Sequence, residues 1–174
     1  MRRALDLAEK GRGTTRPNPL VGAVIVKDGH VIAEGYHRRA GSDHAEVVAL
    51  KKAGRRARGA TVYVTLEPCC HTGSTGPCCD ALVEAEVARV VIPVLDPNPI
   101  VSGRGARRLR KAGIELTRGV LQQEARRQND LYFGRHQLGR PYIILKSAQT
   151  LDGRIAASNG QSQWITGKQA RTIG

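Results

Sequence analysis

Short apolar runs alternate with stretches of helical periodicity along most of the chain, up to residue 139. The runs rich in β-branched residues predict strands at Leu20–Val26, Val31–Tyr36, Thr61–Leu66, Arg89–Val94 and Ile114–Leu116. The other stretches predict helices at Arg2–Lys10, His44–Ala53, Pro77–Ala85, Gly105–Ala112 and Val120–His136. Asp28-Gly29, between the first two strands, indicates a hairpin turn. This alternation predicts an α/β domain in which helices cover the faces of a sheet.

A different sequence style begins near Pro141, and we place a domain boundary between residues 1–139 and 140–174. Pro141–Lys146 predicts another apolar strand, and Leu151–Arg154 predicts a turn. Roughly thirty-five residues bury too little surface to fold alone, so we expect the start of a second domain whose remainder is absent. The apolar segment Tyr142–Leu145 is then expected to pack on the first domain or on a partner subunit.

The composition is ordinary for a globular protein, with 40% hydrophobic and 25% charged residues in a chain of 174. No stretch is long and apolar enough to cross a bilayer, and the basic start lacks the apolar core of a signal peptide. We therefore expect a cytoplasmic protein with no membrane partner. In that reducing compartment, four cysteines in two adjacent pairs suit a metal better than disulfides.

The net charge is strongly positive, +13 from 28 basic and 15 acidic residues. Nucleic-acid binders usually concentrate such charge and add aromatic rings for stacking. Here the basic residues are scattered doublets and aromatic residues make up only 3% of the chain. We therefore interpret the charge as a solvated basic surface and not as a nucleic-acid site. Such a surface would help to collect a phosphorylated small substrate.

Two short segments carry the most distinctive chemistry, Asp43–Glu46 and Glu67–Cys79. They offer His44 and two pairs of cysteines as metal ligands. One imidazole and two thiolates suit zinc, and three protein ligands leave the fourth tetrahedral position of the ion for water. Glu46 lies close enough to His44 to move protons to and from that water. Histidine-x-glutamate followed by proline-cysteine is the pattern of zinc deaminases. Both segments lie at predicted helix starts, where ligands gather in α/β sheets.

The pattern alone leaves two alternatives open. A closed structural zinc site could use Cys69, Cys70, Cys78 and Cys79, or three of these with a histidine, which would make the protein a binding module. The second alternative is a nucleobase or tRNA deaminase, which would use the same zinc-bound water and glutamate. Its two cysteines lie in a compact Pro-Cys-x-x-Cys motif, however, whereas the two cysteine pairs here are separated by a longer loop.

The first domain carries further motifs at Pro17–Val24, Gly35–His37, His44–Glu46, Thr65–Cys69, Asp96–Pro99 and Gly103–Gly105. Together with the long cysteine loop, they resemble the deaminase half of the bifunctional riboflavin-biosynthesis deaminase/reductases. Lys146–Ala148, Leu151–Ala156 and Ser162–Thr166 resemble the opening of the family's reductase domain, which has a dihydrofolate-reductase-like fold. The resemblance thus runs through nearly the whole chain.

The resemblance implies a cytidine-deaminase-like fold, three layers α/β/α with a mixed central sheet. It implies zinc-dependent deamination of 2,5-diamino-6-(5-phosphoribosylamino)pyrimidin-4(3H)-one to 5-amino-6-(5-phosphoribosylamino)uracil, with loss of the 2-amino group as ammonia. It selects His44, Cys69 and Cys78 as the ligands of one zinc ion and Glu46 as the proton shuttle. It also places a set of residues against the pyrimidine or its ribose phosphate: Asn18, His37, His71, Thr75, Asp96 and Asn98.

The second segment has its own implied roles. Lys146, Ala148, Ser162 and Trp164 match reductase positions near the substrate or NADPH. NADPH would bind only where a complete reductase domain is supplied, so we expect no reductase activity from this chain. The sequence leaves the oligomeric state open, a homo-oligomer included.

Two departures from the family lie in the loop before the second cysteine pair. Ser74 stands where the family usually has a lysine or arginine, and Gly76-Pro77 stands where it usually has two prolines. We expect these changes to affect substrate affinity more than zinc binding. Outside the motifs, His30 and His136 are expected on the surface.

Overall fold

The computed structural model describes residues 1–71, 76–139 and 143–173. The chain divides into two compact units, Met1–Arg140 and Pro141–Gly174. Within the described ranges, no helix combines the length and the apolar character needed to cross a bilayer.

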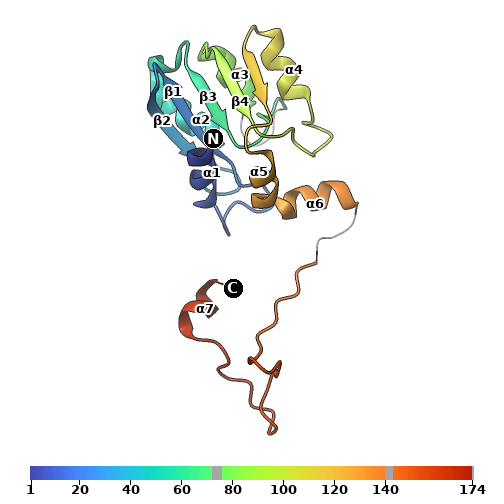
Figure 1. Cartoon of the computed structure of the whole chain (residues 1–174). Coiled ribbons are helices and arrows are strands. Elements are labelled where there is room, and N and C mark those ends of the chain that lie inside the picture. The colour runs from blue at the N-terminus through green and yellow to red at the C-terminus, as the bar shows by residue number, and fades with distance from the viewer. Residues whose placement is uncertain (72–75, 140–142, 174) are drawn as a thin grey trace. The chain divides into compact units, whose positions relative to one another are not determined.

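The first unit is built on a mixed five-stranded sheet (Figure 1). Its strands, in the order β2-β1-β3-β4-β5, are β1 (Gly22–Lys27), β2 (His30–Tyr36), β3 (Thr61–Val64), β4 (Arg89–Ile92) and β5 (Glu115–Arg118). β1 pairs antiparallel with β2 and β3, whereas β4 runs parallel to β3 and β5. The β1–β2 hairpin closes through Asp28 and Gly29, whose φ angles of 49° and 76° are the positive values that the predicted turn requires.

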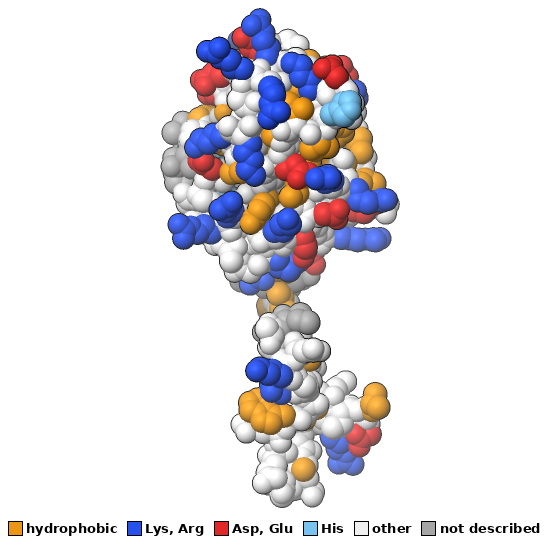
Figure 2. All heavy atoms as spheres, turned by 90° about the vertical axis from the view of Figure 1, so that its left-hand side faces the viewer, with side chains coloured by type: hydrophobic (Ala, Val, Ile, Leu, Met, Phe, Trp, Pro, Cys, Tyr) orange, Lys and Arg blue, Asp and Glu red, His pale blue; other side chains and the backbone are white. Residues whose placement is uncertain are grey.

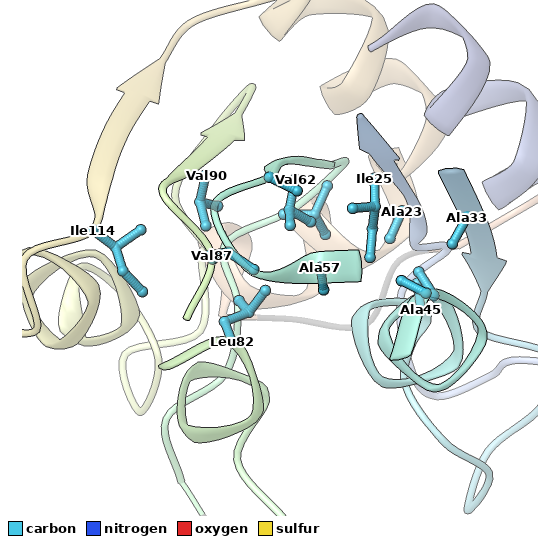
Figure 3. Packing of buried hydrophobic residues seen from close by; sticks show 14 of the residues in the cluster. Ala23, Ile25, Ala33, Ala45, Ala57, Val62, Leu82, Val87, Val90 and Ile114 are labelled. Atoms are coloured by element: carbon cyan, nitrogen blue, oxygen red, sulfur yellow. The ribbon is translucent and has the colours of Figure 1, made fainter. Parts of the chain in front are cut away.

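Helices cover one face of the sheet with α2 (Ala45–Ala53), α3 (Cys78–Glu84) and α4 (Arg104–Lys111). A short 3-10 turn, Gly54–Ala57, continues α2. The main core lies between this layer and the strands, where Ile25, Val62 and Val90 pack with Leu82 of α3 (Figure 3). These side chains are buried because alternate strand residues point to the same face of the sheet.

The opposite face of the sheet carries α1 (Arg2–Glu9), which lies beside α5 (Gln122–Gln128). α1 approaches the sheet so closely that a Cβ on Gly22 would meet the carbonyl oxygen of Ala4 at 2.0 Å, so only glycine fits there. α6 (Asp130–Leu138) follows α5, and its Phe133 forms a small second core with Leu66 and Val94. The three-layer α/β/α arrangement with a mixed sheet is therefore confirmed.

The predicted single helix Val120–His136 is wrong, because the segment forms the two helices α5 and α6. They meet at Asn129, whose φ and ψ of −114° and 30° are not helical. The Asn129 amide donates to the carbonyl oxygen of Leu20 and accepts from its N–H, both at 2.8 Å. These paired hydrogen bonds are buried, and they fix Asn129 in a conformation that local helical periodicity cannot reveal.

The predicted strand Pro141–Lys146 is not formed by its described residues, and Pro141 and Tyr142 lie outside them. Within the described part of this unit, Ile143, Ile144 and Leu145 are all largely exposed, and the packing of this apolar segment on another domain or subunit stays a prediction. A strand needs a neighbouring strand to satisfy its backbone groups, and the described part of this unit offers none. The turn near Leu151–Arg154 is present: the backbone N–H of Gly153 donates to the Thr150 carbonyl, and the N–H of Thr150 donates to the Arg154 carbonyl, both at 2.9 Å.

Charged side chains are distributed over the first unit. Figure 2 shows lysine and arginine side chains interspersed with aspartate and glutamate across the visible face. Several form ion pairs at the surface, such as Arg108 with Asp80 and Arg58 with Glu86, each at 3.0 Å. Exposed pairs of this kind contribute little to stability, roughly 0–1 kcal/mol each.

Candidate metal centre and substrate pocket

One histidine and two cysteines converge where β3 ends and two helices begin. His44 Nδ1 and the Sγ atoms of Cys69 and Cys78 all lie within 4.8 Å of one another. The histidine nitrogen is 3.1 Å from the Cys78 sulfur and 3.5 Å from the Cys69 sulfur. Two thiolates and an imidazole nitrogen form the donor set that zinc prefers, and three ligands leave a tetrahedral position free.

The local structure explains this convergence. His44 is the N-cap of α2 in an extended conformation, and Cys78 is the first residue of α3 after the N-cap Pro77. The backbone N–H of Cys78 points to the Cys69 sulfur at 3.4 Å, and the N–H of Cys79 donates to the Cys69 carbonyl at 3.0 Å. The first residues of α3 thus hold Cys69 in place, so that its sulfur lies close to the sulfur of Cys78.

The electrostatics of the cluster favour a bound cation. Hydrogen bonds from Cys78 and His44 lower the pKa of Cys69 to about 4, and the same shared proton together with burial raises the pKa of Cys78. Metal binding would release the remaining proton to solvent and hold both sulfurs as thiolates. The donor set therefore fits zinc by its chemistry as well as by its spacing.

Glu46 lies in the first turn of α2 and is almost fully buried, with 3% of its surface exposed. Burial is the largest cause that raises the pKa of its carboxyl to about 7. A carboxyl that titrates near neutral pH can both accept and donate a proton. The spacing of His44 and Glu46 could not establish that they face one site, and the extended conformation of His44 before the helix brings both to the same pocket.

A pocket of about 390 Å³ opens over the metal cluster, with His44, Cys69 and Glu46 in its lining. The residues expected to contact substrate also line it where the structure describes them: Asn18, His37, His71, Asp96 and Asn98. Thr75 and the variant position Ser74 lie outside the described residues. The structure therefore brings five of the six expected contacts to one cavity, and their roles stay predictions.

His37 and Asn18 form one hydrogen-bonded side of this pocket. Burial lowers the pKa of His37, so its imidazole is neutral at pH 7. His37 Nδ1 is 3.2 Å from the carbonyl oxygen of Asp43, and its Nε2 is 3.1 Å from the amide nitrogen of Asn18. These partners assign the ring proton to Nδ1 and make Nε2 the acceptor. The Asn18 amide is thereby oriented, with its oxygen left for another donor.

Asp96 and Asn98 lie in the loop after β4, on another side of the pocket. Asp96 Oδ1 accepts the backbone N–H of Asn98 at 2.8 Å and the hydroxyl of Tyr132 at 3.0 Å. Asn98 Oδ1 in turn accepts the N–H of Ile100 at 3.1 Å. Burial raises the pKa of the Asp96 carboxyl. These contacts fix the loop that carries Asp96 and Asn98 and so support this side of the pocket.

Sequence reasoning missed Glu67 as a pocket residue. Glu67 is buried, and its carboxylate accepts three backbone N–H groups, from Asp96 at 3.1 Å, Gly103 at 2.9 Å and Ala106 at 2.9 Å. It therefore ties the cysteine loop to the segment that carries Asp96. Its position two residues before Cys69 is visible in the sequence, but its partners lie far along the chain.

Replacing Glu67 with glutamine is expected to lower the free energy of unfolding by about 1–3 kcal/mol while zinc binding is retained. An amide places an N–H donor where the carboxylate accepts, so one buried backbone donor loses its partner. Urea unfolding and metal analysis of the purified variant check this. Glu84→Gln, an exposed change on α3, is the matched control. An unfolding midpoint equal to that of the control would contradict the proposed tie.

Cys70 and Cys79 are not part of the described metal group. Cys79 is buried and its thiol points to the carbonyl oxygen of Pro68 at 3.3 Å, and burial raises its pKa. Cys70 packs against the main core. A closed site built from all four cysteines is therefore not the arrangement found among the described residues.

α6 supplies a further wall of the pocket through Tyr132, Arg135 and His136. His136, expected on the surface, is partly buried and lines the cavity.

The four residues matched to the reductase family lie in the second unit. Lys146, Ala148, Ser162 and Trp164 are all exposed, and the Trp164 ring lies under the guanidinium of Arg171 at 4.0 Å. Their roles stay predictions.

Two family models match the chain. The cytidine and deoxycytidylate deaminase zinc-binding region matches residues 1–94, and the RibD C-terminal domain matches residues 141–173. The segment between these ranges, which includes α4, α5 and α6, is covered by neither of the two matches.

Curated relatives match the chain along nearly its full length. The riboflavin biosynthesis protein RibD of Escherichia coli is 58% identical over 171 residues, which are 98% of this chain and 47% of the relative. RibD of Aquifex aeolicus is 54% identical over 173 residues, 99% of this chain and 49% of the relative. The chain thus spans about half the length of these curated relatives.

Solved structures give the same result. RibD of Acinetobacter baumannii superposes with a TM-score of 0.91 at 50% identity, covering 99% of this chain and 48% of that one. The Thermotoga maritima diaminohydroxyphosphoribosylaminopyrimidine deaminase/5-amino-6-(5-phosphoribosylamino)uracil reductase has a TM-score of 0.90 at 46% identity, covering 99% and 50%. The Aspergillus oryzae Rib2 deaminase, 23% identical with a TM-score of 0.64 over 79% of this chain and 92% of that one, shares the fold.

Proposed function

Because this chain belongs to the cytidine and deoxycytidylate deaminase family, we propose that it is the zinc-dependent pyrimidine deaminase of riboflavin biosynthesis. The substrate is 2,5-diamino-6-(5-phosphoribosylamino)pyrimidin-4(3H)-one, and water replaces its 2-amino group. The products are 5-amino-6-(5-phosphoribosylamino)uracil and ammonia. The observation that carries the proposal is the convergence of three zinc-type ligands and the buried Glu46 in one pocket.

His44, Cys69 and Cys78 would hold the zinc ion. When bound, zinc supplies a water whose pKa falls towards about 7. Glu46 would accept one proton from the attacking water and pass it to the ring nitrogen, and would then accept the remaining proton of the attacking oxygen and pass it to the departing amine. Its buried carboxyl, with a pKa of about 7, suits both directions of transfer. The oxygen of the water becomes the new carbonyl oxygen, and the amine leaves as ammonia.

The remaining pocket residues bind and orient the substrate. The oriented amide of Asn18 and the neutral His37 offer fixed polar groups on one side. Asp96 and Asn98 offer them on another side, from a loop held by buried hydrogen bonds. Fixed groups of this kind place the reacting carbon against the attacking water, which lowers the entropic part of the barrier. The pocket walls also exclude bulk water from the reacting atoms.

Ammonia release on three substrates tests this function. The zinc-loaded chain is incubated with the phosphorylated diaminopyrimidinone, with cytidine and with adenosine-containing RNA, and a metal-stripped sample serves as the control. We expect release from the first substrate only, and only with zinc. Release from cytidine or RNA instead would assign the chain to another deaminase class, and release from none would support a structural zinc site.

This chain is expected to show no NADPH binding in the micromolar range and no NADPH-dependent reduction of the deaminated product. Reduction needs a pocket that encloses a nicotinamide ring, and Lys146, Ser162 and Trp164 are exposed. A fluorescence titration with NADPH and an assay with the deaminated product check this. Saturable micromolar binding would contradict the single-activity proposal, whatever the outcome of the ammonia assay.

A further inference from the structure

α6 turns one face towards the substrate pocket. Tyr132, Arg135 and His136 all line the cavity, and their spacing of three and four residues puts them on the same side of a helix. This wall lies in the segment that neither family model matches, residues 95–140. The zinc-type cluster and Glu46 lie within the matched part, so the α6 wall is a separate contribution to the pocket.

The α6 wall is fixed in place by contacts on both sides of the helix. The Tyr132 hydroxyl donates to Asp96, 3.0 Å from Oδ1 and 3.3 Å from Oδ2, and its ring meets that of His136 edge-on at 4.8 Å. Phe133, the next residue, is buried with Leu66 and Val94. The helix therefore cannot rotate without breaking either the buried core or the hydrogen bonds to Asp96.

The charges of the lining residues are unequal. Glu46, Glu67 and Asp96 bring three carboxyl groups to the cavity, and the last two are already satisfied by N–H or O–H donors. Among the described lining residues, Arg135 is the one whose positive charge is permanent. Its guanidinium forms no ion pair with a described carboxylate, although arginines elsewhere in this unit do. An anionic ligand is the partner that this arrangement lacks.

We propose that Arg135 binds the phosphate group of the substrate. The inference rests on the proposed function, because it assumes a phosphorylated pyrimidine whose ring lies at Glu46 and the zinc ligands. Glu46 and the ligand Cys78 are buried, whereas Arg135 lines the same pocket with an exposed side chain, so a substrate whose ring lies at Glu46 can extend its ribose phosphate towards Arg135. A guanidinium can donate two parallel N–H groups to two phosphate oxygens. The contact therefore orients the phosphate as well as attracting its charge.

Arg135→Gln is expected to lower kcat/KM for the phosphorylated substrate about 10-fold and to leave that for the dephosphorylated form nearly unchanged. The loss appears mainly in KM, because the phosphate is remote from the reacting carbon. Arg135→Lys keeps the charge but not the fork of N–H groups, so it should recover part of the loss. Arg127→Gln, the same charge change at an exposed position of α5, is the matched control.

Two results would overturn the proposal. Equal losses on both substrates would show that Arg135 supports the pocket without sensing phosphate. A parent protein that deaminates both substrates equally well would also refute phosphate binding, while leaving the deaminase function intact.

A binding measurement keeps the test independent of turnover. Ribose 5-phosphate is titrated calorimetrically into the zinc-loaded parent, Arg135→Gln and Arg127→Gln. We expect binding by the parent and by Arg127→Gln, with about 10-fold weaker binding by Arg135→Gln, and a smaller difference at high salt. Equal affinity in all three proteins, or no binding by the parent, would overturn the assignment even if no deamination were seen.

Discussion

Replacing Cys69 or Cys78 with serine is expected to abolish stoichiometric zinc binding, whereas Cys70→Ser and Cys79→Ser should keep one zinc per chain. The first two sulfurs lie with His44 Nδ1 in one cluster, and the other two do not belong to it. A hydroxyl is a poor substitute for a thiolate on zinc, and two remaining ligands do not hold the ion. Metal analysis of the four purified variants decides the ligand set.

The four variants also provide their own controls. Cys70→Ser is the matched control for Cys69→Ser, because the two residues are adjacent and both are partly buried. Cys79→Ser is the control for Cys78→Ser at the start of α3, and its hydroxyl can donate to the Pro68 carbonyl as the thiol does. Circular dichroism confirms that each variant is folded. Zinc loss from Cys70→Ser or Cys79→Ser as severe as from its neighbour would contradict the assigned ligands.

Glu46→Gln is expected to keep zinc and the fold but to lower turnover by about 10²- to 10⁴-fold. Glutamine has the same shape, so it fits the buried site, but it cannot accept a proton from the attacking water. Because burial holds the pKa of Glu46 near 7, the carboxyl exchanges protons readily at neutral pH and the amide does not. The measurement is kcat at saturating substrate for a variant whose zinc content equals that of the parent.

Glu84→Gln on α3 is the matched control for this change, because Glu84 is an exposed glutamate in a helix of the same layer. It should retain parental turnover. Glu46→Gln with full zinc and a turnover close to that of the control would refute the role of Glu46 as the proton shuttle.

The elements that local pattern determines were predicted well. The five strands lie where apolar and β-branched residues cluster, within a few residues at each end. The Asp28-Gly29 hairpin has the positive φ angles that its residue types allow. α2 and α3 begin one residue after His44 and Pro77, where the predicted helices start. These features depend on residues that are close together in the sequence, so the local sequence is enough to predict them.

The features that long-range contacts determine were not predicted. Asn129 interrupts a continuous helical pattern because its amide pairs with Leu20, 109 residues earlier. That break directs α6 to the pocket and brings in Tyr132 and Arg135. Glu67 likewise receives its N–H donors from residues 29 to 39 positions later. Sequence periodicity carries no information on such pairings.

The candidate site lies between these two cases. Residue types and their order indicated zinc and the partner Glu46, but they left all four cysteines as candidates. The resemblance selected Cys69 and Cys78, and the structure places these two sulfurs beside His44. The spacing of His44 and Glu46 could not show that they face one site. The extended N-cap conformation of His44, φ −71° and ψ 161°, is the local detail that brings them together.

The most direct test of zinc-dependent hydrolytic deamination is product analysis in water enriched in heavy oxygen. The zinc-loaded chain is incubated with the phosphorylated diaminopyrimidinone, and ammonia and the isotopic mass of the product are measured. We predict equal amounts of ammonia and product, one heavy oxygen atom in each product molecule, and neither product nor ammonia from the metal-stripped chain until zinc is restored. No ammonia from the zinc-loaded chain, or a deaminated product without heavy oxygen, would contradict the account.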